Sequence, residues 1–123
     1  MELILKILLW IVTAICLLGG MNLLLKGANP FLPEAMRPQK ILDNLFRFLS
    51  GIYFGLGFLM AWVNFHIQES NGLIYFIGIV VVFSGLGRLY SRIKVGPAGK
   101  YFDSMMVIEI SLGIAIVLLQ YLR

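Results

Sequence analysis

Four long apolar runs, separated by short polar segments, constrain this chain more than any other feature of its sequence. The runs cover approximately residues 3–25, 41–65, 73–93 and 102–122. A helix needs about 20 apolar residues to cross the hydrocarbon core of a bilayer, and each run reaches that length. The sequence therefore predicts an all-α fold, an integral membrane bundle of four transmembrane helices.

The composition is that of a chain surrounded by lipid rather than water. Hydrophobic residues make up 60% and charged residues 13% of the 123 residues, whereas a soluble domain carries about 25% charged residues. A chain of this length forms one domain, so we expect residues 1–123 to be a single four-helix unit. Its first expected partner is the lipid bilayer.

Several other classes of partner and cofactor are excluded. The net charge is +4, but the basic residues lie in short segments between apolar runs, which is typical of membrane loops and not of a nucleic-acid-binding surface. Cys16 is the single cysteine, so neither a disulfide within the chain nor a cysteine-based metal site can form. His66, the lone histidine, is interpreted as a surface residue. We expect no nucleic acid, no metal and no cofactor.

Lysine and arginine are distributed unevenly between the two ends of the predicted helices. Loops 26–40 and 94–100, with the helix ends that border them, carry eight of these residues, and the other side carries Lys6 and Arg123. Cytoplasmic loops are enriched in lysine and arginine. The bias predicts that both loops are cytoplasmic and that the N- and C-termini lie outside. The expected location is the inner membrane of a bacterium.

Each of the two middle helices has an arginine and two glycines on one face. These residues are Arg47, Gly51 and Gly55 on the second helix and Gly78, Gly85 and Arg88 on the third. Glycine allows membrane helices to approach closely. The turn between these helices is short, which predicts antiparallel neighbours with both arginines at the same end.

Polar residues at one depth predict a site near the cytoplasmic end. Ionisable groups inside a span are costly and usually face other helices. Arg47, Arg88 and Glu109 lie about five to seven residues inside their helices, or roughly 7–11 Å below the ends. Asn22 reaches a similar depth, with Asp43 and Asn44 just above. The predicted ligand-binding residues are Arg47, Arg88, Glu109, Asp43, Asn44 and Asn22.

The chemistry of this cluster favours an anionic ligand. Arginine stays charged when partly desolvated and presents a planar fork to carboxylate or phosphate. We expect Glu109 to pair with one arginine and leave the other for an anionic amphiphile, such as a lipid headgroup or a fatty or isoprenoid carboxylate or phosphate. The favoured function is a binding or accessory module.

Other functions fit the same residues. The chain could be an enzyme acting on a lipophilic substrate, with Glu109 as a catalytic general acid or base; a water-accessible pocket around Glu109 would favour that. It could also be a structural subunit whose glycine faces dock a partner membrane protein or a second copy of the chain. A buried Arg–Glu network can also serve only to fix helix packing.

The same segments carry a resemblance. Residues 42–53, residues 85–89 with Gly96-Pro97, and Glu109 resemble the small bacterial membrane proteins grouped as domain of unknown function 4345. The resemblance covers nearly the whole chain. It implies a four-helix integral membrane protein without a known activity, and it emphasises Arg47, Arg88 and Glu109. Small multidrug transporters have their essential glutamate in the first helix, which does not match this chain.

Overall fold

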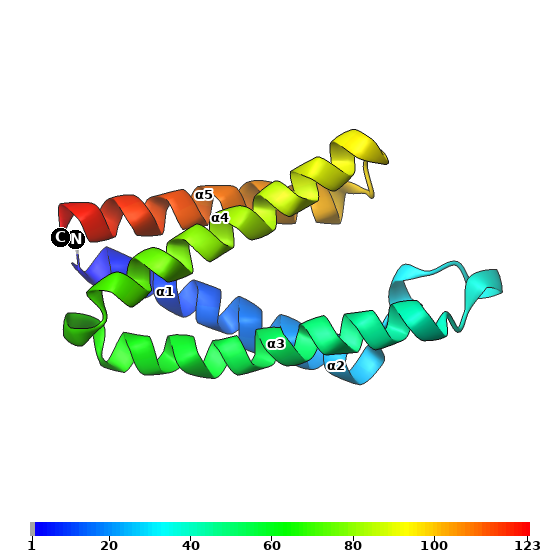
Figure 1. Cartoon of the computed structure of the whole chain (residues 1–123), viewed down its shortest axis with the longest axis horizontal. Helices are drawn as coiled ribbons and strands as arrows, with labels where there is room; N and C mark the ends of the chain where they lie inside the picture. Colours follow the sequence, from blue (N-terminus) through cyan, green and yellow to red (C-terminus); the bar gives the residue numbers. More distant parts are fainter. Residues whose placement is uncertain (1) are drawn as a thin grey trace. The chain divides into compact units, whose positions relative to one another are not determined.

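The computed structural model describes residues 2–123, and in that range the chain is built of helices joined by short turns (Figure 1). The long helical elements are α1 (Glu2–Ala14), the π-helical segment η1 (Ile15–Gly19), α2 (Gly20–Lys26), α3 (Lys40–Phe65), α4 (Asn71–Lys94) and α5 (Lys100–Leu122). Three short 3₁₀ turns lie in the connections: η2 (Asn29–Phe31), η3 (Glu34–Met36) and η4 (Ile67–Glu69). The described residues contain no β-strand.

Between residues 2 and 123, four helices are long and apolar enough to cross a membrane, which confirms the predicted fold class. They are Glu2–Lys26, in which α1, η1 and α2 are continuous, Lys40–Phe65, Asn71–Lys94 and Lys100–Leu122. Each predicted span agrees with one of them to within two residues at either end.

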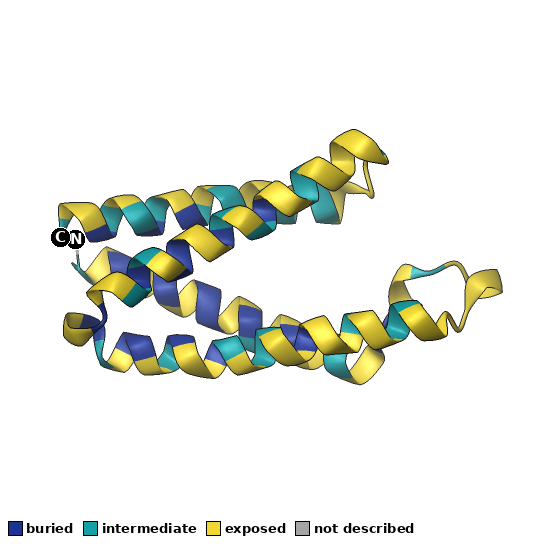
Figure 2. Cartoon of the chain, viewed as in Figure 1, coloured by how far each residue is buried: buried dark blue, intermediate teal, exposed yellow. Residues whose placement is uncertain are grey.

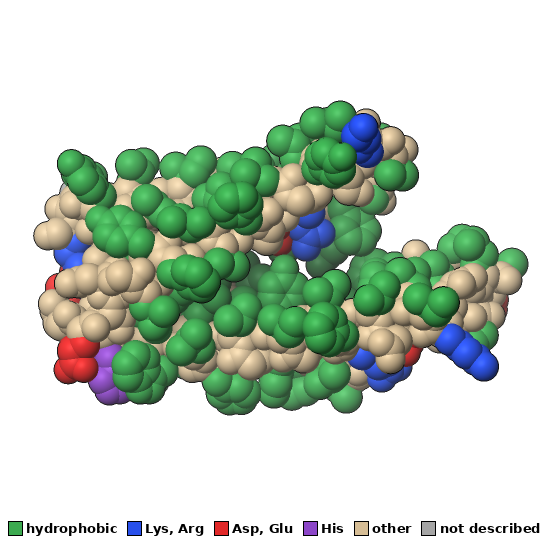
Figure 3. All heavy atoms as spheres, viewed as in Figure 1, with side chains coloured by type: hydrophobic (Ala, Val, Ile, Leu, Met, Phe, Trp, Pro, Cys, Tyr) green, Lys and Arg blue, Asp and Glu red, His purple; other side chains and the backbone are tan. Residues whose placement is uncertain are grey.

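Large apolar side chains are exposed along all four helices (Figure 2). Leu18, Phe65 and Tyr121 each keep more than 70% of their surface accessible. Hydrophobic side chains also dominate the visible surface, while lysine and arginine gather toward the helix ends (Figure 3). Lipid, and not water, is the surrounding in which such a surface is stable.

The chain forms two compact units. One combines the chain up to Leu8 with His66–Arg123, and the other is Leu9–Phe65, so the boundary lies inside α1. The sequence predicted that the second and third spans are antiparallel neighbours and that all four helices form one domain. Both statements describe how the two units are arranged relative to each other, so both stay predictions.

In the Leu9–Phe65 unit, α3 packs against the second half of the first membrane helix. A Cβ added at Gly20 would lie 2.9 Å from the backbone nitrogen of Phe54, and one added at Gly57 would press on Leu17. Glycine at these two positions therefore lets the backbones approach. Above Gly51 and Gly55 the space is open, so the predicted glycine pair is not the contact within this unit. The contact face of α3 is rotated away from the face that carries them.

In the other unit, α4 and α5 form a hairpin closed by residues 95–99, and the two helices lie side by side (Figure 1). The contact runs through three glycines. A Cβ added at Gly113 would lie 2.7 Å from the carbonyl oxygen of Gly78, and one added at Gly85 would lie 3.1 Å from the backbone nitrogen of Ile110. The predicted glycine face of the third span is therefore a helix contact, and it is made with the fourth span.

Candidate functional site

A buried ion pair joins the two helices of the α4–α5 hairpin. Nε of Arg88 donates a hydrogen bond of 2.9 Å to Oε2 of Glu109. Ser84 Oγ, one turn earlier on α4, lies 3.2 Å from the same oxygen. Glu109 is only 7% exposed. The sequence predicted that Glu109 would pair with one arginine, and that arginine is Arg88.

Glycine explains why these two side chains meet. Gly85 lies between Ser84 and Arg88 along α4, and its missing Cβ lets α5 approach at Met106 and Ile110. The approach places Glu109 within reach of Arg88. Two charges that are removed from water need such direct pairing, because an unpaired buried charge is strongly destabilising.

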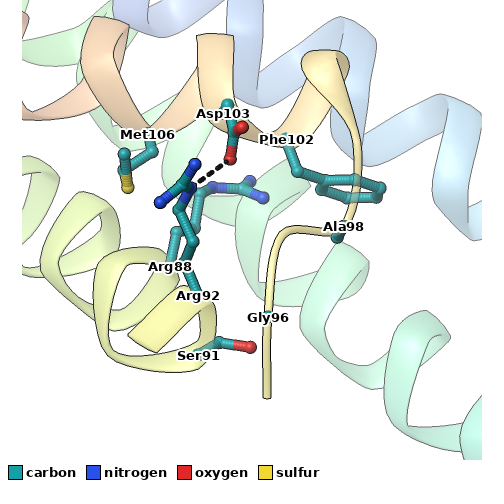
Figure 4. A pocket seen from close by; sticks show the side chains of 8 residues that line it. All are labelled: Arg88, Ser91, Arg92, Gly96, Ala98, Phe102, Asp103 and Met106. Atoms are coloured by element: carbon teal, nitrogen blue, oxygen red, sulfur yellow. Dashed lines mark hydrogen bonds and ion pairs between the residues drawn. The ribbon is translucent and has the colours of Figure 1, made fainter. Parts of the chain in front are cut away.

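A cavity of about 210 Å³ opens at the loop end of this hairpin (Figure 4). Its lining residues are Arg88, Ser91, Arg92, Gly96, Ala98, Phe102, Asp103 and Met106. Two guanidinium groups thus share one cavity with an aromatic ring and a thioether. Such a wall combines cationic donors with an apolar surface.

The second arginine of the cavity is held by a more exposed partner. Nε of Arg92 donates to Oδ1 of Asp103 at 3.1 Å, drawn as a dashed line in Figure 4. The side chains of this pair are 46% and 36% exposed, so the pair adds little to stability. Arg88 also lies 5.8 Å from the centre of the Phe102 ring, in the range of a cation–π contact.

Charge at this end of the hairpin is positive. Arg88, Arg92, Lys94 and Lys100 lie in or beside it, against the carboxylates of Asp103 and Glu109. Glu109 does not line the cavity. It holds Arg88 within the hairpin. Asp103 is the single carboxylate among the residues that line the cavity. No group of three metal-ligating side chains occurs between residues 2 and 123.

Arg47 and Asp43 belong to the Leu9–Phe65 unit, where they form a clasp at the start of α3. Nε of Arg47 donates to Oδ2 of Asp43 at 2.8 Å, and its Nη1 donates to the carbonyl oxygen of Leu24 at 2.9 Å. Oδ1 of Asp43 accepts from the backbone N–H of Ala28 at 3.1 Å. The clasp satisfies a carbonyl at the end of α2 that has no partner further along the helix. It fixes the point where the first membrane helix ends.

Glycine is required beside this clasp. Gly27 has a φ of 67° and follows the last residue of α2. A Cβ there would collide with the carboxylate of Asp43 and lie 2.9 Å from Nη2 of Arg47. Both the left-handed backbone and the close carboxylate therefore exclude a side chain.

Of the six predicted ligand-binding residues, four form the two ion pairs just described. The remaining two, Asn22 and Asn44, are not part of either pair, and Asn22 is exposed. The pairs lie in different units, so their convergence into one cluster stays a prediction.

Residues 4–120 match the family model described as Domain of unknown function (DUF4345). The chain belongs to this family. The match extends over all four spans of the DUF4345 chain, which confirms the resemblance seen in its sequence. No curated protein and no solved structure matches the chain.

Four residues of this site in the DUF4345 chain were not predicted from its sequence: Ser84, Arg92, Phe102 and Asp103. Ser84, Arg88 and Arg92 are spaced by four residues, which places them along one side of α4. This spacing could have predicted that Ser84 and Arg92 lie on the same face of α4 as Arg88. The approach of Asp103 and Phe102 depends on how residues 95–99 turn, which has no comparable pattern.

Proposed function

We propose that this DUF4345 chain is a multi-pass protein of the inner membrane of a bacterium and binds an anionic amphiphile at the loop end of its α4–α5 hairpin. The observation that carries the proposal is the cavity of about 210 Å³ lined by Arg88 and Arg92 together with Phe102 and Met106. Its size suits a headgroup and not a whole lipid, whose chains would remain in the bilayer.

The distribution of charge supports a cytoplasmic position for this cavity. Eight of the ten lysines and arginines belong to the side that carries loops 26–40 and 94–100, as expected of a cytoplasmic side. The cytoplasmic leaflet is also rich in anionic lipid. Within its unit, Arg123 Nη1 lies 3.9 Å from Oε1 of Glu2, which supports termini on the same side and an even number of spans.

The two arginines provide complementary contributions to binding. Arg88 is oriented by its hydrogen bond to the buried Glu109, so little side-chain entropy remains to be lost when a ligand binds. Arg92 is nearly half exposed and can turn toward a phosphate or carboxylate. A guanidinium binds either group through paired N–H donors. Phe102 and Met106 offer an apolar surface to the first carbons of the ligand.

Binding is favoured over catalysis because of the surroundings of Glu109. Its Oε2 accepts a hydrogen bond from Arg88 and lies 3.2 Å from Oγ of Ser84, and its side chain is 9% exposed. A general acid or base must reach the proton that it transfers. Glu109 is enclosed between the helices and paired with Arg88, which fits a residue that holds Arg88 in position.

Lipid retention tests the proposal. The full-length protein, reconstituted in phosphatidylcholine nanodiscs containing phosphatidic acid, is extracted and examined by native mass spectrometry. Two variants are compared with the unaltered protein: Arg92→Gln and the charge-balanced double variant Arg88→Gln/Glu109→Gln. Each should reduce the amount of retained phosphatidic acid by about tenfold, because each loses one charge-assisted hydrogen bond to the ligand.

The matched control is Arg37→Gln, which removes a charge from an exposed loop arginine on the same predicted side. It should retain phosphatidic acid like the unaltered protein. Equal retention in all four proteins, with unchanged helix content by circular dichroism, would disprove an anion site at this cavity.

A further inference from the structure

The cavity at the loop end of the α4–α5 hairpin is bordered by one tight and one loose ion pair. Nε of Arg88 lies 2.9 Å from Oε2 of the buried Glu109, whereas Nε of Arg92 lies 3.1 Å from Oδ1 of Asp103. Charge-assisted N–H···O bonds are usually about 2.7–2.9 Å long, so the second bond is long for its kind. Both side chains of that pair are also more than a third exposed. Asp103 can therefore leave Arg92, while Glu109 stays enclosed between the helices at Arg88.

A ligand that binds Arg92 has to take the place of Asp103. This carboxylate is tethered beside Arg92 in the same hairpin, and a tethered group has a much higher effective concentration than a free one. A ligand carboxylate has the same charge as the aspartate and would only repeat its contact with Arg92. A phosphate diester, which also has a single negative charge, gains no more. An amphiphile with either head therefore profits little from the exchange.

A phosphate monoester differs from both in charge and in shape. Near pH 7 it carries about 1.5 to 2 negative charges and presents three acceptor oxygens. Arg88 and Arg92 are one turn apart on α4, where side chains are neighbours, and both line the cavity. Their side chains extend from α4 toward the start of α5 (Figure 4). The additional oxygen and charge let one monoester bind both guanidinium groups at once.

The net charge at this end of the hairpin matches a dianion. Residues 84–109 include four basic side chains and two acidic ones, and four minus two leaves an excess of two positive charges. These residues are Arg88, Arg92, Lys94 and Lys100 against Asp103 and Glu109. A fully ionised phosphate monoester has the charge that balances this excess, whereas a carboxylate or a diester balances half of it.

We infer that the head of the bound amphiphile is a phosphate monoester, which replaces Asp103 at Arg92 and contacts Arg88 at the same time. The inference rests on the proposed function and narrows its ligand from anions in general to one class. The displaced Asp103 carboxylate turns to water, to which it is already partly accessible. Asp103 thus competes with every anion for Arg92, and a ligand that binds both arginines overcomes this competition. The phosphate belongs either to a glycerolipid or to an isoprenoid.

The test uses the full-length protein in phosphatidylcholine nanodiscs with four probes: dioleoyl phosphatidic acid, geranylgeranyl monophosphate, dioleoyl phosphatidylglycerol and oleic acid. Native mass spectrometry measures how much of each is retained. At least one of the two monoesters should be retained about tenfold better than the diester and the carboxylate, which is the effect of one more charge-assisted hydrogen bond. In Arg88→Gln/Glu109→Gln, which leaves one arginine at the cavity, this ratio should fall to about one.

Substitutions of Asp103 test the competition directly. Asp103→Asn removes the competing charge and should raise retention of the monoester by up to about fivefold, as expected when an exposed ion pair no longer has to be broken. Asp103→Glu keeps the charge and should retain the ligand like the unaltered protein. Glu34→Gln removes a carboxylate from an exposed loop on the same predicted side, so it is the matched control and should change nothing. Unfolding would lower retention, so a gain also reports a folded protein.

The outcomes separate the two sources of the phosphate. Retention of phosphatidic acid alone assigns a glycerolipid, retention of the prenyl monophosphate alone assigns an isoprenoid, and retention of both assigns recognition of the phosphate without regard to the chain. Each of these results supports the inference.

The inference is overturned if phosphatidylglycerol or oleic acid is retained as well as the monoesters, or if Asp103→Asn fails to raise retention. If Arg92→Gln then still lowers retention of all probes, the anion site of the proposed function stands without this selectivity. Retention that does not depend on Arg92 would disprove the site and the inference together.

Discussion

Arg88 and Glu109 are joined across the α4–α5 hairpin by a hydrogen bond of 2.9 Å in which the carboxylate is almost fully enclosed and the guanidinium is partly accessible. The pair has two effects. It links the helices one turn beyond the glycine contact at Gly85, and it fixes an arginine at the edge of a cavity. The Glu109 carboxylate therefore has the structural role, and the Arg88 guanidinium has the proposed role in binding.

Removing only the carboxylate should destabilise the protein strongly. Glu109→Ala leaves the Arg88 guanidinium, whose side chain is 29% exposed, without its buried partner, and we expect a loss of about 3 kcal/mol of unfolding free energy. The double variant Arg88→Met/Glu109→Leu removes both charges and should recover most of that loss. Thermal unfolding in detergent followed by circular dichroism measures both. Equal destabilisation by the single and double variants would show that the charge itself is not the cause.

Glycine at position 85 should be required, whereas glycine two positions later should not. A Cβ at Gly85 would lie 2.5 Å from Cγ1 of Ile110 and 3.1 Å from the carbonyl oxygen of Met106. Gly85→Ala should therefore cost about 1–3 kcal/mol through overpacking. Gly87→Ala meets nothing within 4 Å and should stabilise α4 by up to about 1 kcal/mol. The two unfolding temperatures should move in opposite directions, and a common direction would contradict the described contact.

Gly27→Ala should loosen the clasp formed by Asp43 and Arg47. The substitution places a Cβ in a backbone with a φ of 67° and against the Asp43 carboxylate, so we expect a cost of at least about 1 kcal/mol. Gly19→Ala, within the same membrane helix but with open space above it, is the matched control. Limited proteolysis of loop 26–40 in detergent provides the readout. Faster cleavage in Gly27→Ala but not in Gly19→Ala is the expected result.

The proposed orientation can be checked by labelling from one side of the membrane. Cys16 is the only cysteine, so Cys16→Ser gives a background without thiols. A cysteine introduced by Ala98→Cys should resist a membrane-impermeant maleimide in intact spheroplasts, because its loop is expected in the cytoplasm. One introduced by Gln68→Cys, in the turn between the second and third spans, should react. Labelling of the cysteine at position 98 but not of the one at position 68 would show that the topology is the opposite of the one proposed.

The fold could be predicted from the sequence because the length of an uninterrupted apolar run is read from consecutive residues and does not depend on tertiary contacts. The Arg88–Glu109 pair was accessible for a related reason, since ionisable residues well inside a span have few options other than pairing. Gly51 and Gly55 show the limit of the same reasoning. Spacing identifies which residues share a face, but it does not determine which face meets a neighbour, and in α3 the contact within its unit is made at Gly57.

Other features depended on three-dimensional arrangement that no spacing reveals. Arg92 and Asp103 meet because residues 95–99 reverse the chain. Gln120 and Arg123 near the chain end have the ordinary pattern of polar residues at a membrane interface. Their side chains meet at Asn71, because Nε2 of Gln120 and Nη2 of Arg123 both contact Oδ1 of that residue, and no spacing in the sequence indicates this contact.

The π-helical segment Ile15–Gly19 has a consequence for how this chain tolerates changes in length. In a π turn the hydrogen bonds reach one residue further than in an α turn, so the segment accommodates an additional residue without redirecting the helix beyond it. Loss of one residue within it would convert the turn to α-helix and leave Gly20 against Phe54. Loss of a residue between Gly20 and Lys26 would instead rotate every later side chain of this helix by about 100°. The first membrane helix therefore has one short stretch in which a deletion preserves its packing.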